Sequence, residues 1–297
     1  MASGEAAHIP VMSAEVMSSL SPAPGEFFID GTFGAGGHAR LICERLAPGG
    51  VLLAVDRDPL AYERAAEHFS CSGVRVIAKN ANYSSIPRLI EEEGLPKANG
   101  LLLDLGFSSL QLEEGRGFSF MKDEPLLMTY SDEDEPLRDI LHRMTKDEIA
   151  DTIYLYSGER FSRHIANAIF KAERKRKIET TGELVSVIKS VLPRGYERGR
   201  INHATRTFLA FRILANRELD HLREILDSLP KIMAPGSRVA IITFQSLEDR
   251  EVKEKFKEFS KKGIIDLLSK KPVPASREES TINPRARSAK LRSAVIK

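Results

Sequence analysis

The chain has 297 residues with a formal net charge of +2, and its 42% hydrophobic and 29% charged residues allow a substantial core, in one large domain with an insertion or in two domains. Only two cysteines occur, Cys43 and Cys71, without metal-binding spacing, and no apolar run approaches the roughly 18 residues that span a bilayer. These features argue against a disulfide scaffold, a zinc cluster and a membrane protein, and because the start lacks a signal-like segment we expect a protein of the reducing cytoplasm.

Short apolar runs alternate with helical patterns over the first 110 residues. Gaps of about 20 residues separate the runs, and each gap has room for one helix, such as 39–47 before the "PGG" stop. Runs that are continuously apolar indicate strands covered on both faces, so the sequence predicts an α/β fold with a Rossmann-like, doubly wound parallel sheet. The runs are "FFID" (27–30), "VLLAVD" (51–56), "VRVIA" (74–78) and "LLLDL" (101–105).

The alternation stops after Leu105, and the next strand pattern, 237–244, comes more than 130 residues later. A crossover is far shorter than this. The sequence therefore predicts a sheet domain of residues 1–111 and 206–297, interrupted by a helical insertion domain at 112–205 that recognises the substrate. Helical patterns cover 136–155, 159–175, 181–192 and 203–228, the last of which we expect to return to the sheet, and 264–268 with 291–296 are candidates for a closing antiparallel hairpin.

Charges are sorted along the chain in a way that the net charge hides. Residues 113–151 hold 12 acidic and 5 basic residues, whereas 159–218 hold 14 basic and 6 acidic ones, and 267–297 hold 8 basic and 2 acidic ones. Two basic stretches indicate a site for a polyanion such as nucleic acid. The alternative is that "KAERKRK" is only the solvated face of a helix.

A glycine-rich segment, "DGTFGAGGH" (30–38), follows the first strand. Its glycines, Gly34 and Gly36, fit the dinucleotide pattern G-x-G-x-x-A, and Asp56 stands at the end of the second strand, where an acid binds ribose hydroxyls. This pattern alone is weak, because the same geometry serves any cofactor that carries a nucleoside. A nicotinamide-dependent oxidoreductase is therefore one alternative.

Carboxylates end three of the expected parallel strands: Asp30, Asp56 and Asp104. The carboxyl ends of parallel strands form the ligand crevice of this architecture. Acids there would repel a pyrophosphate but attract the sulfonium and ammonium groups of S-adenosylmethionine, with Asp104 near the cationic end of the ligand. The alternative for Asp30 or Asp104 is that the side chain only caps a turn.

The chain resembles the bacterial 16S ribosomal RNA (cytosine-N4)-methyltransferase family over nearly its whole length. The resemblance implies a Rossmann-like methyltransferase domain with a helical insert, S-adenosylmethionine as cofactor, and a cytosine of the decoding region of small-subunit ribosomal RNA as methyl acceptor. It also allows a homodimer, which nothing in the residues requires. The matching motifs are "HIPVM" (8–12), "DGTFGAGGH", "DRDP" (56–59), "DLGFSSLQL" (104–112), "GFSF" (117–120), "ERFSRHIANAI" (159–169), "HATRTFLAFRI" (203–213), "SLEDR" (246–250) and "NPRARSAKLR" (283–292).

By this resemblance the cofactor contacts are Gly36, Gly37, His38, Asp56, Tyr83, Asp104 and Gln111. Tyr83 stands where the family commonly has phenylalanine, so a ring that stacks on adenine is kept. Without the resemblance, Tyr83 reads as a core aromatic and His38 as a polar residue at a helix start, and Gln111 gives no signal.

Chemistry is expected in "DLGFSS" (104–109), where related amino-methyltransferases place a "DPPY"-like motif. The attacking amine needs a hydrogen-bond acceptor, for which Asp104 is the first candidate and Ser108 and Ser109 are the next. Phe107 either stacks on a flipped base or packs beneath the insert. We expect phosphate contacts from Arg206, Arg212, Arg285, Arg287, Lys290 and Arg292.

Three residues depart from the family pattern: Leu127, Thr129 and Gln245, the last of which replaces a histidine. Gln245 can form hydrogen bonds but cannot titrate near neutral pH. These departures leave open a protein that binds the donor and assists ribosome assembly with little turnover. DNA also stays open as the methyl acceptor, because phosphate contacts do not depend on the sugar.

Overall fold

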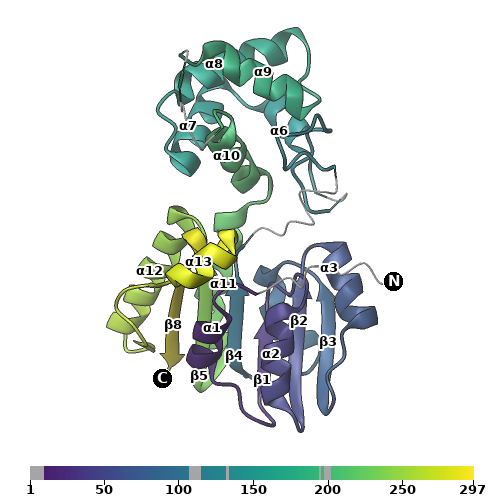
Figure 1. Cartoon of the computed structure of the whole chain (residues 1–297), viewed down its shortest axis with the longest axis vertical. Helices are drawn as coiled ribbons and strands as arrows, with labels where there is room; N and C mark the ends of the chain where they lie inside the picture. Colours follow the sequence, from purple (N-terminus) through teal and green to yellow (C-terminus); the bar gives the residue numbers. More distant parts are fainter. Residues whose placement is uncertain (1–9, 107–114, 132–133, 194, 197–201) are drawn as a thin grey trace. The chain divides into compact units, whose positions relative to one another are not determined.

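The structure is a computed structural model that describes residues 10–106, 115–131, 134–193, 195–196 and 202–297. The chain divides into two compact units (Figure 1). The sheet unit comprises Met1–Gly106 and Leu219–Lys297, and the helical unit comprises Phe107–Glu218. Each unit has buried apolar clusters of its own, so each can be described by itself.

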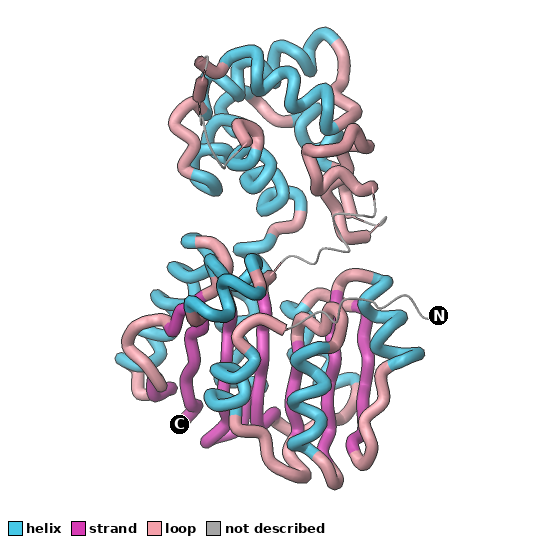
Figure 2. Tube along the Cα trace, in the orientation of Figure 1, coloured by secondary structure: helices cyan, strands magenta, loops and turns pink. Residues whose placement is uncertain are grey.

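The sheet unit is built on one eight-stranded sheet in the order β3-β2-β1-β4-β5-β8-β6, with β7 paired to β8. The strands lie side by side in Figure 2, flanked by helices. The five strands from β3 to β5 are parallel, and β8 runs antiparallel to β5, β6 and β7. The strands are β1 (Phe27–Asp30), β2 (Gly50–Asp56), β3 (Val74–Asn80), β4 (Ala98–Asp104), β5 (Met233–Thr243), β6 (Ile265–Leu267), β7 (Val273–Pro274) and β8 (Lys290–Ile296).

Helices cover both faces of this sheet because successive strand residues point to opposite sides. Ile29 of β1 belongs to the apolar cluster formed with α4 (Ile86–Glu92), α11 (Glu218–Ile232) and α12 (Ser246–Lys261). Phe28, the preceding residue, belongs to the cluster formed with α1 (Ser13–Leu20) and α2 (Gly37–Leu46). The predicted α/β architecture is thereby confirmed, including the antiparallel strands near the end of the chain.

Short helical segments complete the sheet unit and lie in its connections. After β2 the chain forms α3 (Pro59–Glu63) and the π-helical turn η1 (Arg64–His68), and after β3 it forms the 3₁₀ turn η2 (Tyr83–Ser85). Near the end of the chain, α13 (Arg277–Ile282) and η3 (Pro284–Ser288) precede β8. The sequence patterns did not predict α1, α13 or β7.

The helical unit contains α6 (Leu137–Arg143), α7 (Lys146–Ser157), α8 (Ser162–Lys175), α9 (Thr181–Val191) and α10 (Thr205–Ala215). Their apolar sides form one buried cluster, with Ile153 from α7, Ile165 from α8 and Phe211 from α10. Helix α7 begins with a capping box, in which the Thr145 hydroxyl accepts the Glu148 N–H and the Glu148 carboxylate accepts the Thr145 N–H. It ends at Gly158, which adopts the left-handed conformation.

The limits of the insert differ from the predicted 112–205, because α10 belongs to the helical unit and the sheet unit resumes only at Leu219. The pattern at 203–228 predicted one helix, but the chain turns between α10 and α11, where Arg217 has a φ of 48°. The Asn216 amide fixes this turn by donating to the carbonyls of Met128 (2.7 Å) and Arg212 (2.9 Å). Phe208 and Phe211 on α10 then pack in the core of the insert.

Within the described ranges, no helix combines the length and the apolar character needed to cross a membrane.

Candidate cofactor and active site

Three acids meet at one edge of the sheet. Asp30, Asp56 and Asp104 are the last residues of β1, β2 and β4, and these strands are parallel neighbours in the order β2-β1-β4. Asp30 pairs in register with Ala54 of β2 and Leu102 of β4, so the other two acids lie two residues further along their strands. The predicted gathering of the three carboxylates at the carboxyl edge is therefore present.

The glycine-rich loop joins β1 to α2 and is tied to both neighbouring strands. The Gly31 N–H donates to the Leu102 carbonyl (3.0 Å), and the Phe33 N–H donates to the Val55 carbonyl (3.1 Å). Gly36 has a φ of 78°, and a Cβ atom there would lie 2.7 Å from the Phe33 ring, so this position requires glycine. Helix α2 starts at the next residue, Gly37, and its first turn therefore begins beside the strand-end acids.

Asp56 shapes this loop. Its Oδ2 accepts the Gly34 N–H (2.8 Å) and its Oδ1 accepts the Asp58 N–H (3.0 Å). Burial raises the pKa of Asp56 to about 6, although these two N–H groups act in the opposite direction. Each carboxylate oxygen can accept a further hydrogen bond, so a contact with ribose hydroxyls is compatible with the structural role.

Asp30, His38 and Asp104 form a cluster of polar groups inside the loop. Asp30 is 1% exposed and His38 is 7% exposed. The His38 Nε2 lies 3.6 Å from the Asp104 Oδ2, and the Thr32 hydroxyl accepts the Asp104 N–H (2.7 Å). Three buried atoms of this cluster have no hydrogen-bond partner among the described residues. They are the two ring nitrogens of His38 and the Asp30 Oδ2. Buried polar atoms are rarely left unpaired, so this cluster has free capacity for a ligand.

The pKa values of Asp30 and His38 are both raised from their ordinary values. Burial raises the pKa of Asp30 to about 7, against the opposing effects of His38 and the Thr32 N–H. For His38, burial acts to lower the pKa, but the carboxylates of Asp104 and Asp30 outweigh it and the pKa is raised. Both shifts favour the protonated forms in the unliganded chain, and a ligand with cationic groups would favour the ionised form of Asp30.

Tyr83 is placed at the same edge by η2, the turn that follows β3. Its ring is half-buried and packs against the core of the sheet unit, and a Cβ atom on Gly31 would lie 3.3 Å from the Tyr83 Cβ. This position next to the β1 loop suits an adenine contact but also satisfies the alternative, a core aromatic. Stacking on adenine stays a prediction.

Four of the predicted residues, Phe107, Ser108, Ser109 and Gln111, lie outside the described residues. The chain leading to them is described as far as Gly106, whose N–H donates to the Asp104 Oδ1 (3.3 Å). A Cβ atom on Gly106 would lie 2.9 Å from the Phe244 ring at the end of β5. The segment expected to carry the chemistry therefore starts between the ends of β4 and β5.

Gln245 has a structural role that its departure from the family pattern did not reveal. It precedes α12, its Nε2 donates to the Glu248 Oε1 (2.8 Å), and the Glu248 Oε2 accepts the N–H groups of Phe244 (3.0 Å) and Gln245 (3.2 Å). Gln245 is thus the N-cap residue of α12. A capping box ordinarily begins with Ser or Thr, so in the sequence only Glu248 matches the pattern. The buried Oε1 of Gln245 has no hydrogen-bond partner within the described part of the chain.

The other two departures lie in the helical unit. Thr129 is buried, and both its carbonyl (2.6 Å) and its hydroxyl (3.1 Å) accept hydrogen bonds from the Arg116 guanidinium. The Leu127 carbonyl accepts the Leu137 N–H (2.7 Å) at the start of α6. These residues hold the segment before α6 in place.

Most of the basic residues predicted to bind phosphate already have partners in the chain. Arg212 forms a bidentate pair with Glu218 (2.8 and 3.1 Å), and Arg292 pairs with Asp249 (2.7 Å). The remaining contacts are Arg206 with Glu159 (3.5 Å), Lys290 with Asp249 (3.7 Å) and Arg287 with the Ser280 carbonyl (3.4 Å), and Arg285 lies in η3. A phosphate would have to compete with these carboxylates, so these contacts stay predictions.

Comparison with known proteins gives one consistent result. The family model described as "MraW methylase family" matches residues 5–297. Relatives named "Ribosomal RNA small subunit methyltransferase H" include those of Deinococcus radiodurans (42% identical, over 96% of this chain and 88% of the relative) and Deinococcus deserti (43%, 97% and 92%). A third, from Geobacter sulfurreducens, is 42% identical over 97% of this chain and 98% of its own length. The similarity therefore covers both units.

Proposed function

The chain belongs to the MraW methylase family, and we propose from this premise that it methylates the exocyclic N4 amine of a cytosine in the decoding region of 16S ribosomal RNA. It is an S-adenosylmethionine-dependent methyltransferase, and ribosomal RNA is its substrate class. The observation that supports the proposal most strongly is the buried Asp30, His38 and Asp104 cluster, whose unpaired polar atoms lie at the end of the glycine loop.

The residues of the sheet edge fit this cofactor. S-adenosylmethionine, when bound, supplies a methyl group that its sulfonium charge makes electrophilic. Asp30 and Asp104 offer negative charge to the cationic groups, and His38 offers ring nitrogens without partners in the described part of the chain. We assign the ribose hydroxyls to Asp56 and the adenine to Tyr83. We assign the methionine part to the backbone of the glycine loop at Gly36 and Gly37.

Asp104 is our first candidate for the group that accepts a hydrogen bond from the target amine. The lone pair of an exocyclic amine is delocalised into the ring, and an acceptor at the amine hydrogen helps to release it for attack. One oxygen of Asp104 is held by the Gly106 N–H, and the other faces His38 at 3.6 Å. As the acceptor, Asp104 would take up the proton that the methylated amine loses. Ser108 and Ser109 are the alternatives for the acceptor.

The nature of the substrate sets the remaining expectations. The names of the relatives and the motifs of the chain support the small-subunit RNA, either free or in the assembled subunit, as the partner. We infer a cytoplasmic location from that substrate. A target base must leave its stack to reach an enclosed donor, so we expect a flipped cytosine. A homodimer stays a prediction.

Transfer of a labelled methyl group tests the proposal. Small subunits and free 16S RNA from cells that lack this modification would be incubated with the chain and labelled S-adenosylmethionine. We expect label in the RNA, and calorimetry should show binding of S-adenosylhomocysteine but not of NAD. Tight binding without transfer to either substrate would contradict the proposal and support the assembly-factor alternative.

A further inference from the structure

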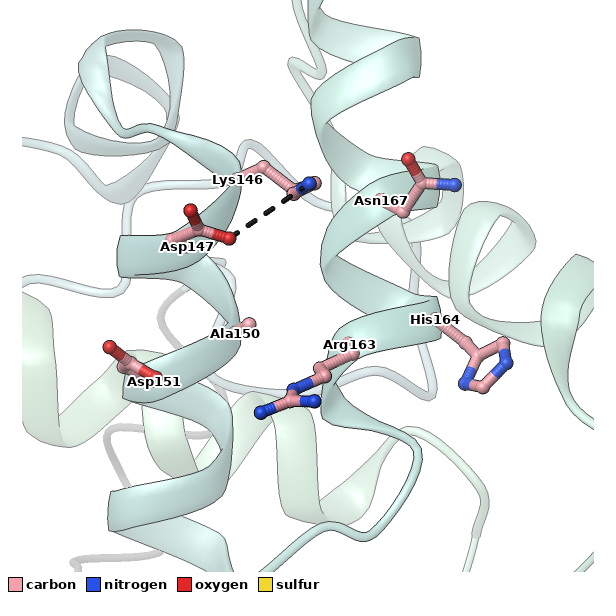
Figure 3. A pocket seen from close by; sticks show the side chains of 7 residues that line it. All are labelled: Lys146, Asp147, Ala150, Asp151, Arg163, His164 and Asn167. Atoms are coloured by element: carbon pink, nitrogen blue, oxygen red, sulfur yellow. Dashed lines mark ion pairs between the residues drawn. The ribbon is translucent and has the colours of Figure 1, made fainter.

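A groove on the helical unit lies between α7 and α8 and has a volume of about 600 Å³. One wall is the α7 face with Lys146, Asp147, Ala150 and Asp151, and the other is the α8 face with Arg163, His164 and Asn167 (Figure 3). In Figure 3 the Lys146 and Arg163 side chains reach into the space between the helices from opposite walls. All of these residues belong to one unit, and the proposed transfer site does not use them.

Basic side chains continue from this groove along α8. Arg163, Lys171 and Arg174, here called the α8 stripe, are spaced eight and three residues apart, which places them on one face of the helix. All three are exposed, and none has a carboxylate partner within 4 Å in the described part of the chain. Lys177, just beyond the helix, pairs with Asp139 instead. Arg174 lies over the Phe170 ring, 5.1 Å from its centroid. The stripe therefore differs from the predicted phosphate contacts, most of which pair within the chain, in that no carboxylate of the described residues pairs with it.

The α7 wall has different chemistry. Asp147 and Asp151 place carboxylates in the groove, and Lys146 lies 3.9 Å from Asp147. Tyr154 follows them on the same side of α7 and is 59% exposed, so its ring is accessible for stacking. A ligand that fits both walls needs anionic groups for the stripe and hydrogen-bond donors for the carboxylates.

A nucleotide with an exocyclic amine has both features. Its phosphate suits Arg and Lys, and its amine donates to aspartate. Single-stranded RNA is recognised through base edges and through stacking on exposed aromatic rings, whereas a purely acidic peptide would be repelled by Asp147 and Asp151.

We propose that the α7–α8 groove binds a single-stranded segment of the RNA substrate other than the methylated cytosine. Phosphates lie along Arg163, Lys171 and Arg174. A base that carries an exocyclic amine enters the groove toward Asp147 and Asp151 and stacks on Tyr154. This inference rests on the proposed function, because it concerns the same RNA substrate.

The first test removes the charge of the stripe in the full chain. The variant Arg163→Gln, Lys171→Gln, Arg174→Gln is compared with Lys253→Gln, Lys257→Gln, Lys261→Gln, which removes three exposed lysines spaced four residues apart on α12. Binding of a fluorescent single-stranded fragment of 16S RNA is followed by anisotropy at several salt concentrations, without cofactor. Circular dichroism melts check that both variants fold.

The stripe variant should bind the RNA up to about a hundredfold more weakly at about 0.1 M salt, with a salt slope smaller by about two, because three phosphate contacts are lost. Its affinity for S-adenosylhomocysteine should not change. The α12 variant should bind RNA as the unaltered chain does. Equal weakening in both variants, or none in the stripe variant, would overturn the proposal.

The second test concerns the groove itself. Oligo(A) and oligo(C) carry exocyclic amines and oligo(U) does not, so the unaltered chain should prefer the first two. Asp147→Asn with Asp151→Asn should reduce that preference, and Tyr154→Ala should weaken binding of all three by about tenfold, as loss of a stacking contact does. An unaltered chain without any preference for oligo(A) or oligo(C) would contradict the groove as a base site.

Two further outcomes distinguish RNA binding at the stripe from binding of a ribosomal protein and from methyl transfer. If the stripe variant binds RNA normally but no longer associates with assembled subunits, the partner is a ribosomal protein and the RNA proposal is wrong. If the unaltered chain binds the oligonucleotides through the stripe but transfers no methyl group, the proposed function fails while the RNA site stands.

Discussion

At the scale of single residues, the three strand-end acids differ in how many hydrogen bonds their carboxylate oxygens accept from the rest of the chain. Asp56 accepts a backbone N–H on each oxygen, so its first task is to shape the loop. Asp30 keeps one buried oxygen without a partner in the described residues, and Asp104 faces His38. Asp30 and Asp104 can therefore accept hydrogen bonds from a ligand, whereas both oxygens of Asp56 already accept one from the backbone.

Asp30 should make the unliganded protein less stable as the pH rises. Its pKa is about 7 in the folded chain against an ordinary value of 3.8, so the folded state holds the proton more tightly, and the free energy of unfolding falls between pH 4 and pH 7. From pH 5 to pH 8 the loss is about 2.5 kcal/mol. Urea unfolding at both pH values should show a smaller loss for Asp30→Asn.

The matched control for this prediction is Asp266→Asn, a change of the same kind on β6, three strands from β4 in the sheet. It should keep the pH dependence of the unaltered chain. An unchanged pH dependence in Asp30→Asn would mean that Asp30 is not the titrating group. S-adenosylmethionine should also bind more tightly as the pH rises toward 7, because its positive charge favours ionised Asp30.

Asp104→Asn separates the two roles assigned to Asp104. As the acceptor for the target amine, Asp104 should contribute mainly to turnover, so kcat at saturating donor should fall by about a hundredfold, which is typical for one positioned catalytic group. As an anchor for the cofactor, it should contribute mainly to donor affinity. Steady-state kinetics with donor and RNA varied separately distinguish these roles, and unchanged kcat with a lower donor affinity would contradict the acceptor role.

Sequence alone could predict which carboxylates lie at the site, but not which side chains pack beside them. Asp30, Asp56 and Asp104 follow from the rule that parallel strands end at one edge. His38 was found only through the family resemblance, because its burial beside Asp104 depends on how α2 packs. The capping role of Gln245 could not be predicted, because Gln is not among the residues that ordinarily begin a capping box.

At the scale of elements, the turn between β1 and α2 depends on the backbone of Gly36. Gly36→Ala should lower the free energy of unfolding by about 2 to 4 kcal/mol, since it combines a positive φ with a Cβ atom 2.7 Å from the Phe33 ring. It should also weaken donor binding. Chemical unfolding and calorimetry with S-adenosylhomocysteine measure both effects.

Gly49→Ala is the control for the backbone strain alone. Gly49 has a φ of 85°, and a Cβ atom there would have no neighbouring atom within 4 Å, so alanine should cost about 1 kcal/mol and leave donor binding intact. Equal effects of the two substitutions would show that the contact with Phe33 contributes nothing.

Strands were easier to predict than helix limits. The first strand, Phe27–Asp30, coincides with its apolar run, because a strand buried on both faces needs continuous apolar residues. The break between α10 and α11 gave no such signal. It depends on the hydrogen bond from Asn216 to the distant Met128 carbonyl, which only the tertiary structure creates.

At the scale of the whole molecule, two units with separate cores should unfold separately. Differential scanning calorimetry should show two transitions, and S-adenosylhomocysteine at a hundredfold excess over its Kd should stabilise one of them by about 2.7 kcal/mol, because the proposed donor contacts from Gly36 to Asp104 belong to the sheet unit. Far-UV circular dichroism at each transition identifies the unit. One transition that shifts as a whole would contradict independent unfolding.

The charge pattern predicted a nucleic-acid partner, but it could not predict which basic residues are available to contact the nucleic acid. The excess of basic residues in 159–218 includes Arg206 and Arg212, which are paired within the helical unit, and the α8 stripe, which is not paired with carboxylates in the described residues. Sequence counts cannot distinguish these cases, since ion pairs form only after the helices pack.

The most direct test of the proposed function is the identity of the methylated nucleoside. Small subunits that lack the modification would be incubated with the chain and labelled S-adenosylmethionine, and the RNA would be digested and mapped by mass spectrometry. The account predicts label in an N4-methylated cytidine within the decoding region. Label in a C5-methylated cytidine, in another nucleoside, or at a cytidine outside that region would contradict it.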